Sequence, residues 1–187
     1  EKNIYNTELG LNLSPTVTFP GDIQTALLEA NPDFDPYYRD NELKFQVPGQ
    51  TYWTCTKNIN VPKKMLKAHQ FIEFDGIDTF ADIYVNDIFV GHTENFSRLW
   101  RFDITGILHE GENTIQIKFT PSEAIAIEEA KKLPYPIPCS VYDVTSPNRN
   151  LVRKTQCQAG WDWGPCIMAM GIYNSLKIIQ TDYGFID

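Results

Sequence analysis

Residues 80–91 read FADIYVNDIFVG, and their pattern indicates the class of fold. Apolar residues alternate with others from Phe80 to Val85, which is typical of a half-buried β-strand. The polar pair Asn86-Asp87 separates this run from the apolar run Ile88-Phe-Val-Gly91. Two polar residues between two strand-like runs predict a tight β-hairpin.

Strand-like runs continue on both sides of this hairpin. The run at residues 71–74 is expected to end at Asp75-Gly76. Further runs of strand character lie at residues 100–104, 115–119, 151–152 and 176–179. Because many short strands are separated by turn signals, the sequence predicts an all-β protein with a β-sandwich architecture.

Two segments break the period of two and predict short surface helices. The first covers residues 123–132, where Ser122 is expected to cap the helix and Glu128 to pair with Lys132. The second covers residues 23–29, after Pro20-Gly21. Residues 133–150 contain four prolines and predict a long loop, which in compact domains is usually functional or disordered.

Length and charge exclude several classes of protein. The chain has 187 residues, which is too few for a complete (β/α)8 barrel of about 250 residues. Its net charge of −8 disfavours nucleic acid and anionic membrane surfaces as partners. No apolar run approaches the roughly 20 residues that span a bilayer. Residue 1 is Glu, so we expect the sequence to be part of a longer or processed product.

The four cysteines and three histidines do not have the spacing of a metal site. No C-x-x-C pair occurs, and the histidines are scattered, so neither a metal nor another cofactor is expected. Cys157 and Cys166 flank an aromatic segment. They could form a disulfide across it, or both could be buried thiols, and the sequence leaves these alternatives open.

The segment at residues 153–165, RKTQCQAGWDWGP, carries the clearest functional signal. Trp161 and Trp163 bracket Asp162, with Gly160 and Gly164 outside them. Indole rings stack on the apolar faces of sugar rings, and a carboxylate accepts hydrogen bonds from sugar hydroxyls. The alternative is that both tryptophans belong to the core and Asp162 caps a turn. The nucleophile-elbow, phosphate-loop and dinucleotide motifs are absent from the sequence.

This segment resembles the β-mannosidases of glycoside hydrolase family 2, and the resemblance extends over nearly the whole chain. Other stretches that resemble the family follow in the family's order. They are residues 19–22 (FPGD), 35–42 (DPYYRDNE), 74–86 (FDGIDTFADIYVN), 95–98 (NFSR) and 111–113 (GEN).

The resemblance implies that residues 1–187 form one N-terminal sugar-binding domain, a jelly-roll-like β-sandwich similar to galactose-binding domains. An immunoglobulin-like domain and a (β/α)8 catalytic barrel would follow residue 187. Both catalytic glutamates would belong to that barrel, so no catalytic residue is expected here. The parent enzyme would release terminal β-mannose with retention, and periplasm, secretion or the lysosome would be its location.

The resemblance also implies roles for individual residues. Asp162 would bind sugar hydroxyls, and Trp161 and Trp163 would form walls of the terminal-mannose subsite. Asn41 is a weaker candidate for substrate binding, with a turn-stabilising role as the alternative.

Neighbouring positions are expected to support this site. Arg153 and Lys154 could brace the loop electrostatically, with a charge pair at a strand edge as the alternative. Asp78 is expected to fix a turn. The sequence Tyr173-Asn-Ser replaces the family's frequent W-R-P, which keeps another β-linked sugar open as the substrate.

Two other functions remain open at this stage. The chain could be a free-standing carbohydrate-binding module with the aromatic segment as its platform. It could also be a structural interaction domain whose tryptophans are buried.

Overall fold

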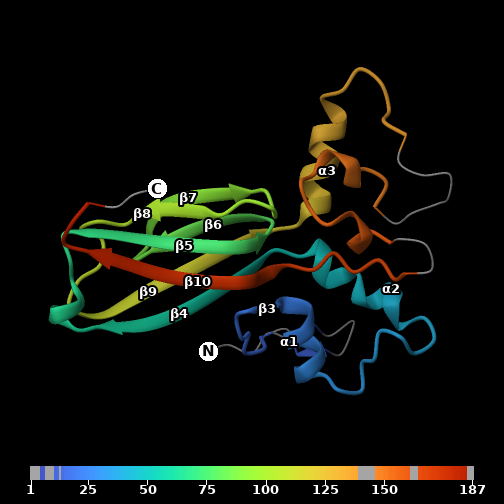
Figure 1. Cartoon of the computed structure of the whole chain (residues 1–187). Helices are drawn as coiled ribbons and strands as arrows, with labels where there is room; N and C mark the ends of the chain where they lie inside the picture. The colour runs from blue at the N-terminus through green and yellow to red at the C-terminus, as the bar shows by residue number, and fades with distance from the viewer. Residues whose placement is uncertain (1–4, 7–10, 13, 139–145, 161–163, 185–187) are drawn as a thin grey trace.

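A computed structural model describes residues 5–6, 11–12, 14–138, 146–160 and 164–184. Two four-stranded antiparallel sheets form a β-sandwich (Figure 1). The first sheet has the order β3 (Gly21–Asp22), β10 (Gly171–Thr181), β5 (His69–Asp78), β8 (Trp100–Asp103). The second has the order β4 (Trp53–Val61), β9 (Gly111–Thr120), β6 (Phe80–Val85), β7 (Ile88–Glu94). A two-stranded sheet pairs β1 (Tyr5–Asn6) with β2 (Leu11–Asn12).

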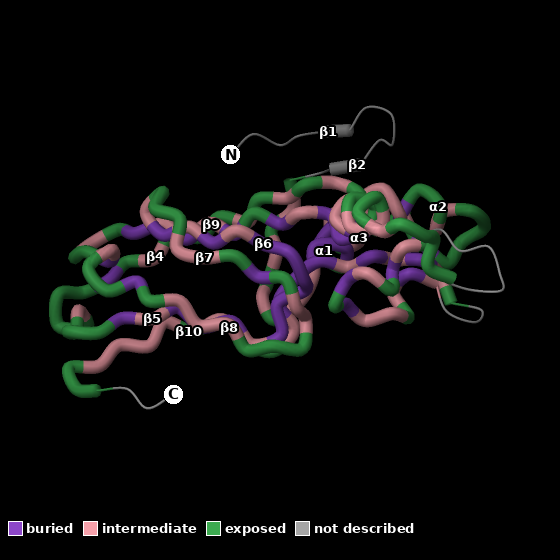
Figure 2. Tube along the Cα trace, turned by 90° about the horizontal axis from the view of Figure 1, so that it is seen from above, coloured by how far each residue is buried: buried purple, intermediate pink, exposed green. Residues whose placement is uncertain are grey.

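The hydrophobic core lies between the two large sheets, where buried segments face each other (Figure 2). Every second residue of β6 points inward, so Ala81, Ile83 and Val85 are each 0 % exposed. Strands β5, β9 and β10 contribute inward side chains in the same way, among them Phe74, Ile117 and Ile172. This alternation confirms the all-β sandwich that the sequence predicts.

The three α-helices of the described ranges gather at one end of the sandwich, at the right of Figure 1. They are α1 (Ile23–Ala30), α2 (Asn41–Phe45) and α3 (Ser122–Lys131). Short 3-10 helices occupy residues 47–50, 63–65, 149–151 and 156–158. Helix α1 belongs to the core as well as to the surface, because Ile23 and Leu27 pack against the sheets. No helix within the described ranges is both long enough and apolar enough to cross a bilayer.

The hairpin and the two helices are confirmed. Asn86 and Asp87 have positive φ values of 50° and 62°, as a two-residue hairpin turn of this hand requires. Helix α1 begins after Asp22, whose carboxylate accepts a hydrogen bond from the Thr25 amide at 2.7 Å.

Four details of the sequence prediction are wrong. Strand β5 does not end at Asp75-Gly76, because Gly76 adopts a φ of +73° and the strand continues to Asp78. Residues 149–151 form a 3-10 helix instead of opening a strand. Ser122 is the first residue of α3, and its buried hydroxyl caps nothing in the described part of the chain. Glu128 pairs with Lys131, one residue nearer than predicted.

Candidate functional site

We define residues 159–166 as the Trp-Asp-Trp loop, and the structure describes the residues at both of its ends. Trp161, Asp162 and Trp163 themselves lie outside the described residues. Ala159 and Cys166 form an antiparallel bridge, so the two ends of the loop lie side by side. The Arg149 guanidinium donates a hydrogen bond to the Gly160 carbonyl at 2.6 Å. Gly160 has a φ of +84°, a conformation that favours glycine.

A buried carboxylate, that of Asp78, is the centre of a hydrogen-bond cluster next to this loop. Lys154 Nζ lies 2.6 Å from Asp78 Oδ2, and the two side chains are 2 % and 0 % exposed. Gln158 Nε2 and the Tyr173 hydroxyl donate to the same oxygen at 3.1 and 3.2 Å. The Thr79 hydroxyl donates to the other oxygen, Oδ1. Buried charge is tolerated when it is paired and hydrogen-bonded, and Asp78 meets both conditions. We call Asp78, Lys154, Gln158 and Tyr173 the Asp78 cluster.

The same side chains also hold the backbone that leaves the loop. Lys154 Nζ donates to the Ala169 carbonyl at 2.5 Å, and the Ala169 amide donates to Gln158 Oε1 at 3.1 Å. On the other side, Gln24 of α1 donates to the Met168 carbonyl at 2.9 Å and accepts from the Met170 amide at 3.0 Å. Residues 168–170 are therefore bonded both to the segment that precedes the loop and to α1.

A β-bulge explains how Tyr173 reaches Asp78. The register between β10 and β5 shifts between Ile172 and Ser175, opposite Gly76. Such an insertion redirects a side chain locally. The Tyr173 ring also packs edge-on against Phe96, with ring centroids 5.3 Å apart.

Burial shifts the proton affinities within the cluster. Loss of hydration lowers the pKa of the Lys154 ammonium, and the neighbouring Asp78 charge opposes this shift. For Tyr173, burial and the Asp78 charge both raise the pKa of the phenol. Removing one partner of the Lys154–Asp78 pair would leave an uncompensated buried charge.

Asn41 is the one predicted sugar-binding residue that lies within the described ranges. It begins α2, and its side-chain Nδ2 donates to the Asp35 carbonyl at 2.9 Å. Its amide nitrogen is therefore used to hold the loop at residues 35–41, as expected of a turn-stabilising residue.

The two basic residues before the loop have different environments. Lys154 is buried in the Asp78 cluster, whereas Arg153 is exposed and pairs through its backbone with Asn95. The Phe96 amide donates to the Arg153 carbonyl at 2.9 Å.

The structure revises the roles expected for two further positions. Asp78 ends strand β5, but its carboxylate is the buried partner of Lys154 and does more than fix a turn. Cys157 is an exposed free thiol, so it forms no disulfide with Cys166. Sequence reasoning missed Gln158, Tyr173 and Gln24 as partners of the loop segments. For Asp78 the one local signal was an acidic residue within a strand-like run, whereas Lys154 lies in a polar stretch that gave none.

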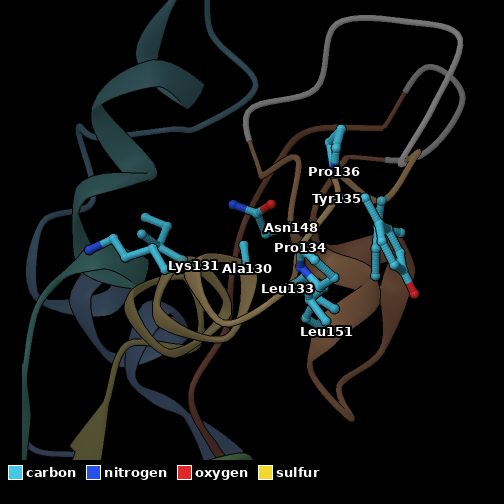
Figure 3. Close-up of a pocket in the computed structure, with 10 residues that line it drawn as sticks. Ala130, Lys131, Leu133, Pro134, Tyr135, Pro136, Asn148 and Leu151 are labelled. Carbon is cyan, nitrogen blue, oxygen red and sulfur yellow. The ribbon is translucent and has the colours of Figure 1, made fainter.

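A separate pocket of about 500 Å³, lined mostly by apolar residues, lies between α3 and the 3-10 helix at 149–151 (Figure 3). Leu133, Pro134, Tyr135 and Leu151 are among its lining residues. Asn41 and the Asp78 cluster do not line it. Within the described ranges, no group of three or more His, Cys, Asp or Glu side chains could hold a metal ion.

Comparisons of the sequence with family models and with known proteins point to the same family. The family model described as "Glycosyl hydrolase 2 galactose-binding domain-like" matches residues 5–174. A β-mannosidase from Capra hircus is 32 % identical over 181 residues, covering 94 % of this chain and 20 % of that protein. β-Mannosidase A from Emericella nidulans is 31 % identical over 179 residues, covering 92 % of this chain and 18 % of that protein.

A solved structure supports the same relationship. The crystal structure of β-D-mannosidase from Dictyoglomus thermophilum superposes with a TM-score of 0.79 at 34 % identity, covering 88 % of this chain and 20 % of that one. The chain thus spans about a fifth of the length of the relatives it matches.

Proposed function

Because the chain belongs to the glycosyl hydrolase 2 galactose-binding domain-like family, we propose that it is the non-catalytic sugar-binding domain of a longer β-mannosidase-like retaining glycosidase. Support comes from relatives that are about five times longer and are named β-mannosidases. In this proposal an immunoglobulin-like domain and a catalytic barrel follow residue 187. The parent enzyme acts in the periplasm, in the lysosome or outside the cell.

The proposed site is the Trp-Asp-Trp loop. Asp162 accepts hydrogen bonds from hydroxyls of the terminal mannose, and the rings of Trp161 and Trp163 pack against its C–H faces. The observation that carries this proposal is the closed base of the loop, where the Ala159–Cys166 bridge and the bond from Arg149 to Gly160 meet. A loop with fixed ends presents its middle residues to a partner with less loss of conformational entropy on binding.

Asn41 has a secondary place in this proposal. Its Nδ2 is bonded to Asp35, so a sugar hydroxyl would donate to its Oδ1. The chain alone does not hydrolyse glycosides, because retaining hydrolysis needs two carboxyl groups about 5–5.5 Å apart that the barrel supplies.

The first test is sugar binding by this chain. Methyl β-D-mannoside should bind to the chain and perturb the nuclear magnetic resonance spectrum of the protein. Asp162→Ala should weaken this binding about 10-fold or more, because a hydrogen bond to a charged group contributes about 1.5–3 kcal/mol. Asp87→Asn is the matched control, because Asp87 is an exposed turn residue whose positive φ suits asparagine. Equal binding by wild type and Asp162→Ala would contradict the assigned role.

The second test uses the intact parent protein and three aryl glycosides. Hydrolysis of the β-mannoside should exceed that of the β-galactoside and the β-glucuronide. A preference for either of the others would favour a family member acting on another β-linked sugar. A gene that ends at residue 187 would instead indicate a free-standing carbohydrate-binding module.

A further inference from the structure

The geometry points to the Asp78 cluster as the device that positions the Trp-Asp-Trp loop: Lys154, Gln158 and Tyr173 are positioning residues that set the loop through one buried carboxylate. The inference rests on the proposed function only for what the loop binds. Its structural part concerns described residues on both sides of the loop.

The first argument is connectivity. Lys154 and Gln158 precede the loop, and Tyr173 follows it, yet all three donate to Asp78 Oδ2 at 2.6–3.2 Å. Gln158 Nε2 also donates to the Tyr173 hydroxyl at 3.2 Å, which joins the entering and leaving segments directly. One carboxylate at the end of β5 therefore ties the entering segment to β5 and to β10, the strand into which the leaving segment runs.

The second argument is the backbone contact. Ala169 is bonded through its carbonyl to Lys154 and through its amide to Gln158. Such paired donor and acceptor contacts specify the distance and the orientation of the two segments together. Apolar packing of the same volume would supply contact area without this direction.

The third argument is charge. A buried ion pair is weak evidence for stability, because desolvation offsets much of its attraction. In this cluster the pair carries directional hydrogen bonds on the two segments of a loop. A positioning role therefore accounts for the cluster better than a gain in stability does.

The test uses the four tryptophans of this chain as reporters, with the protein labelled with 5-fluorotryptophan. Four ¹⁹F resonances are assigned by replacing each tryptophan with phenylalanine in turn. In Lys154→Met, the resonances of Trp161 and Trp163 should shift or broaden more than those of Trp53 and Trp100. Trp53 and Trp100 report on the sandwich, since their indoles donate to the Pro48 and Asn95 carbonyls at 2.8 and 3.1 Å.

Arg101→Met is the matched control. Arg101 pairs with Glu73 of β5 at 2.6 Å. The substitution therefore removes an ion pair with the same N–O distance from the same strand, away from the loop. It should leave the Trp161 and Trp163 resonances in place. If Lys154→Met and Arg101→Met affect all four resonances alike, the cluster is a stabilising element only and the inference is overturned.

Tyr173→Phe keeps the inference testable if Lys154→Met does not fold. This variant removes one hydroxyl and leaves the ion pair intact. It should move the same two resonances by a smaller amount, and unchanged Trp161 and Trp163 signals would overturn the inference.

A sugar titration separates this inference from the proposed function. Methyl β-D-mannoside should bind Tyr173→Phe several-fold more weakly than wild type, and Arg101→Met as tightly as wild type. If the fluorine signals respond as expected but Asp162→Ala binds normally, the positioning role stands and the proposed subsite fails. If Asp162→Ala loses binding while Lys154→Met and Tyr173→Phe leave the fluorine signals unchanged, the subsite stands and the positioning role fails.

Discussion

At the scale of single residues, burial determines how much an ion pair affects the free energy of unfolding. Lys154 and Asp78 are buried together, whereas Lys131 and Glu128 pair on the exposed face of α3 with both side chains more than 60 % exposed. The two ion pairs have the same N–O distance of 2.6 Å. Burial alone therefore predicts that their removal has different consequences.

We predict that Lys154→Met lowers the free energy of unfolding by about 3–5 kcal/mol, because Asp78 is left charged and buried. Lys131→Met should change it by about 1 kcal/mol or less, because water and salt screen an exposed pair. Urea denaturation followed by circular dichroism measures both values. Similar small losses in the two variants would show that the Asp78 site admits water.

The thiols also differ by environment. Cys55 packs against the core, and burial raises the pKa of its thiol to about 11, while Cys157 is exposed. At pH 8 the thiolate, which is the reactive form, is therefore scarce at Cys55.

We predict that a disulfide reagent at pH 8 modifies Cys157 much faster than Cys55 in the folded protein. Peptide mapping by mass spectrometry identifies the modified cysteine. In urea the two rates should converge, and a fast reaction at Cys55 in the native protein would contradict its burial.

At the scale of elements, β10 determines how the helical end joins the sandwich. Its first residue, Gly171, pairs with Asp22 of β3 on one side and with Asp78 of β5 on the other. A Cβ at Gly171 would lie 2.2 Å from the Gly21 carbonyl oxygen and 2.6 Å from Asp22 Cα. The backbone of β3 therefore leaves no space for a side chain there.

We predict that Gly171→Ala costs about 1–3 kcal/mol of stability through overpacking. Gly184→Ala is its control, because a Cβ at Gly184 would meet no atom within 4 Å. Thermal unfolding of both variants tests this, and a Gly171→Ala protein as stable as wild type would mean that β3 moves away from β10 without cost.

At the scale of the whole molecule, buried ionisable groups link folding to pH. The pKa of Cys55 rises from 9.0 to about 11 on folding, so the folded state keeps a proton that the unfolded chain loses. Its contribution to stability is complete below pH 9 and is lost as pH rises through 11. The raised pKa of Tyr173 acts in the same direction above pH 10.

We predict that, under reducing conditions, the free energy of unfolding falls by on the order of 2 kcal/mol between pH 9 and pH 11 because of Cys55. In Cys55→Ala this part of the decline should be absent. Urea titrations across that pH range compare the slopes of the two proteins, and parallel curves would exclude Cys55 as the cause.

The sequence indicated the family, the hairpin and several strands, although β4 was not among them. Alternation in residues 80–85, the Asn86-Asp87 turn and the run 115–119 each carry their signal locally, because side chains on a strand point alternately in and out. Helix α1 was predictable for the same reason, from its own apolar spacing and the turn before it.

The partners of the buried charges follow from tertiary contacts between distant segments. Asp78 and Lys154 are 76 positions apart in the sequence. The bulge that brings Tyr173 to them cannot be predicted from the spacing of apolar residues, and neither can the contact of Gln24 with Met168. The extent of β5 beyond Gly76 and the 3-10 helix at 149–151 also depended on neighbours that are distant in the chain. The periodicity of apolar residues reflects only the neighbours of a residue along its own strand or helix. Packing of the whole chain brings together side chains from distant segments, and no single segment predicts which of them will pair.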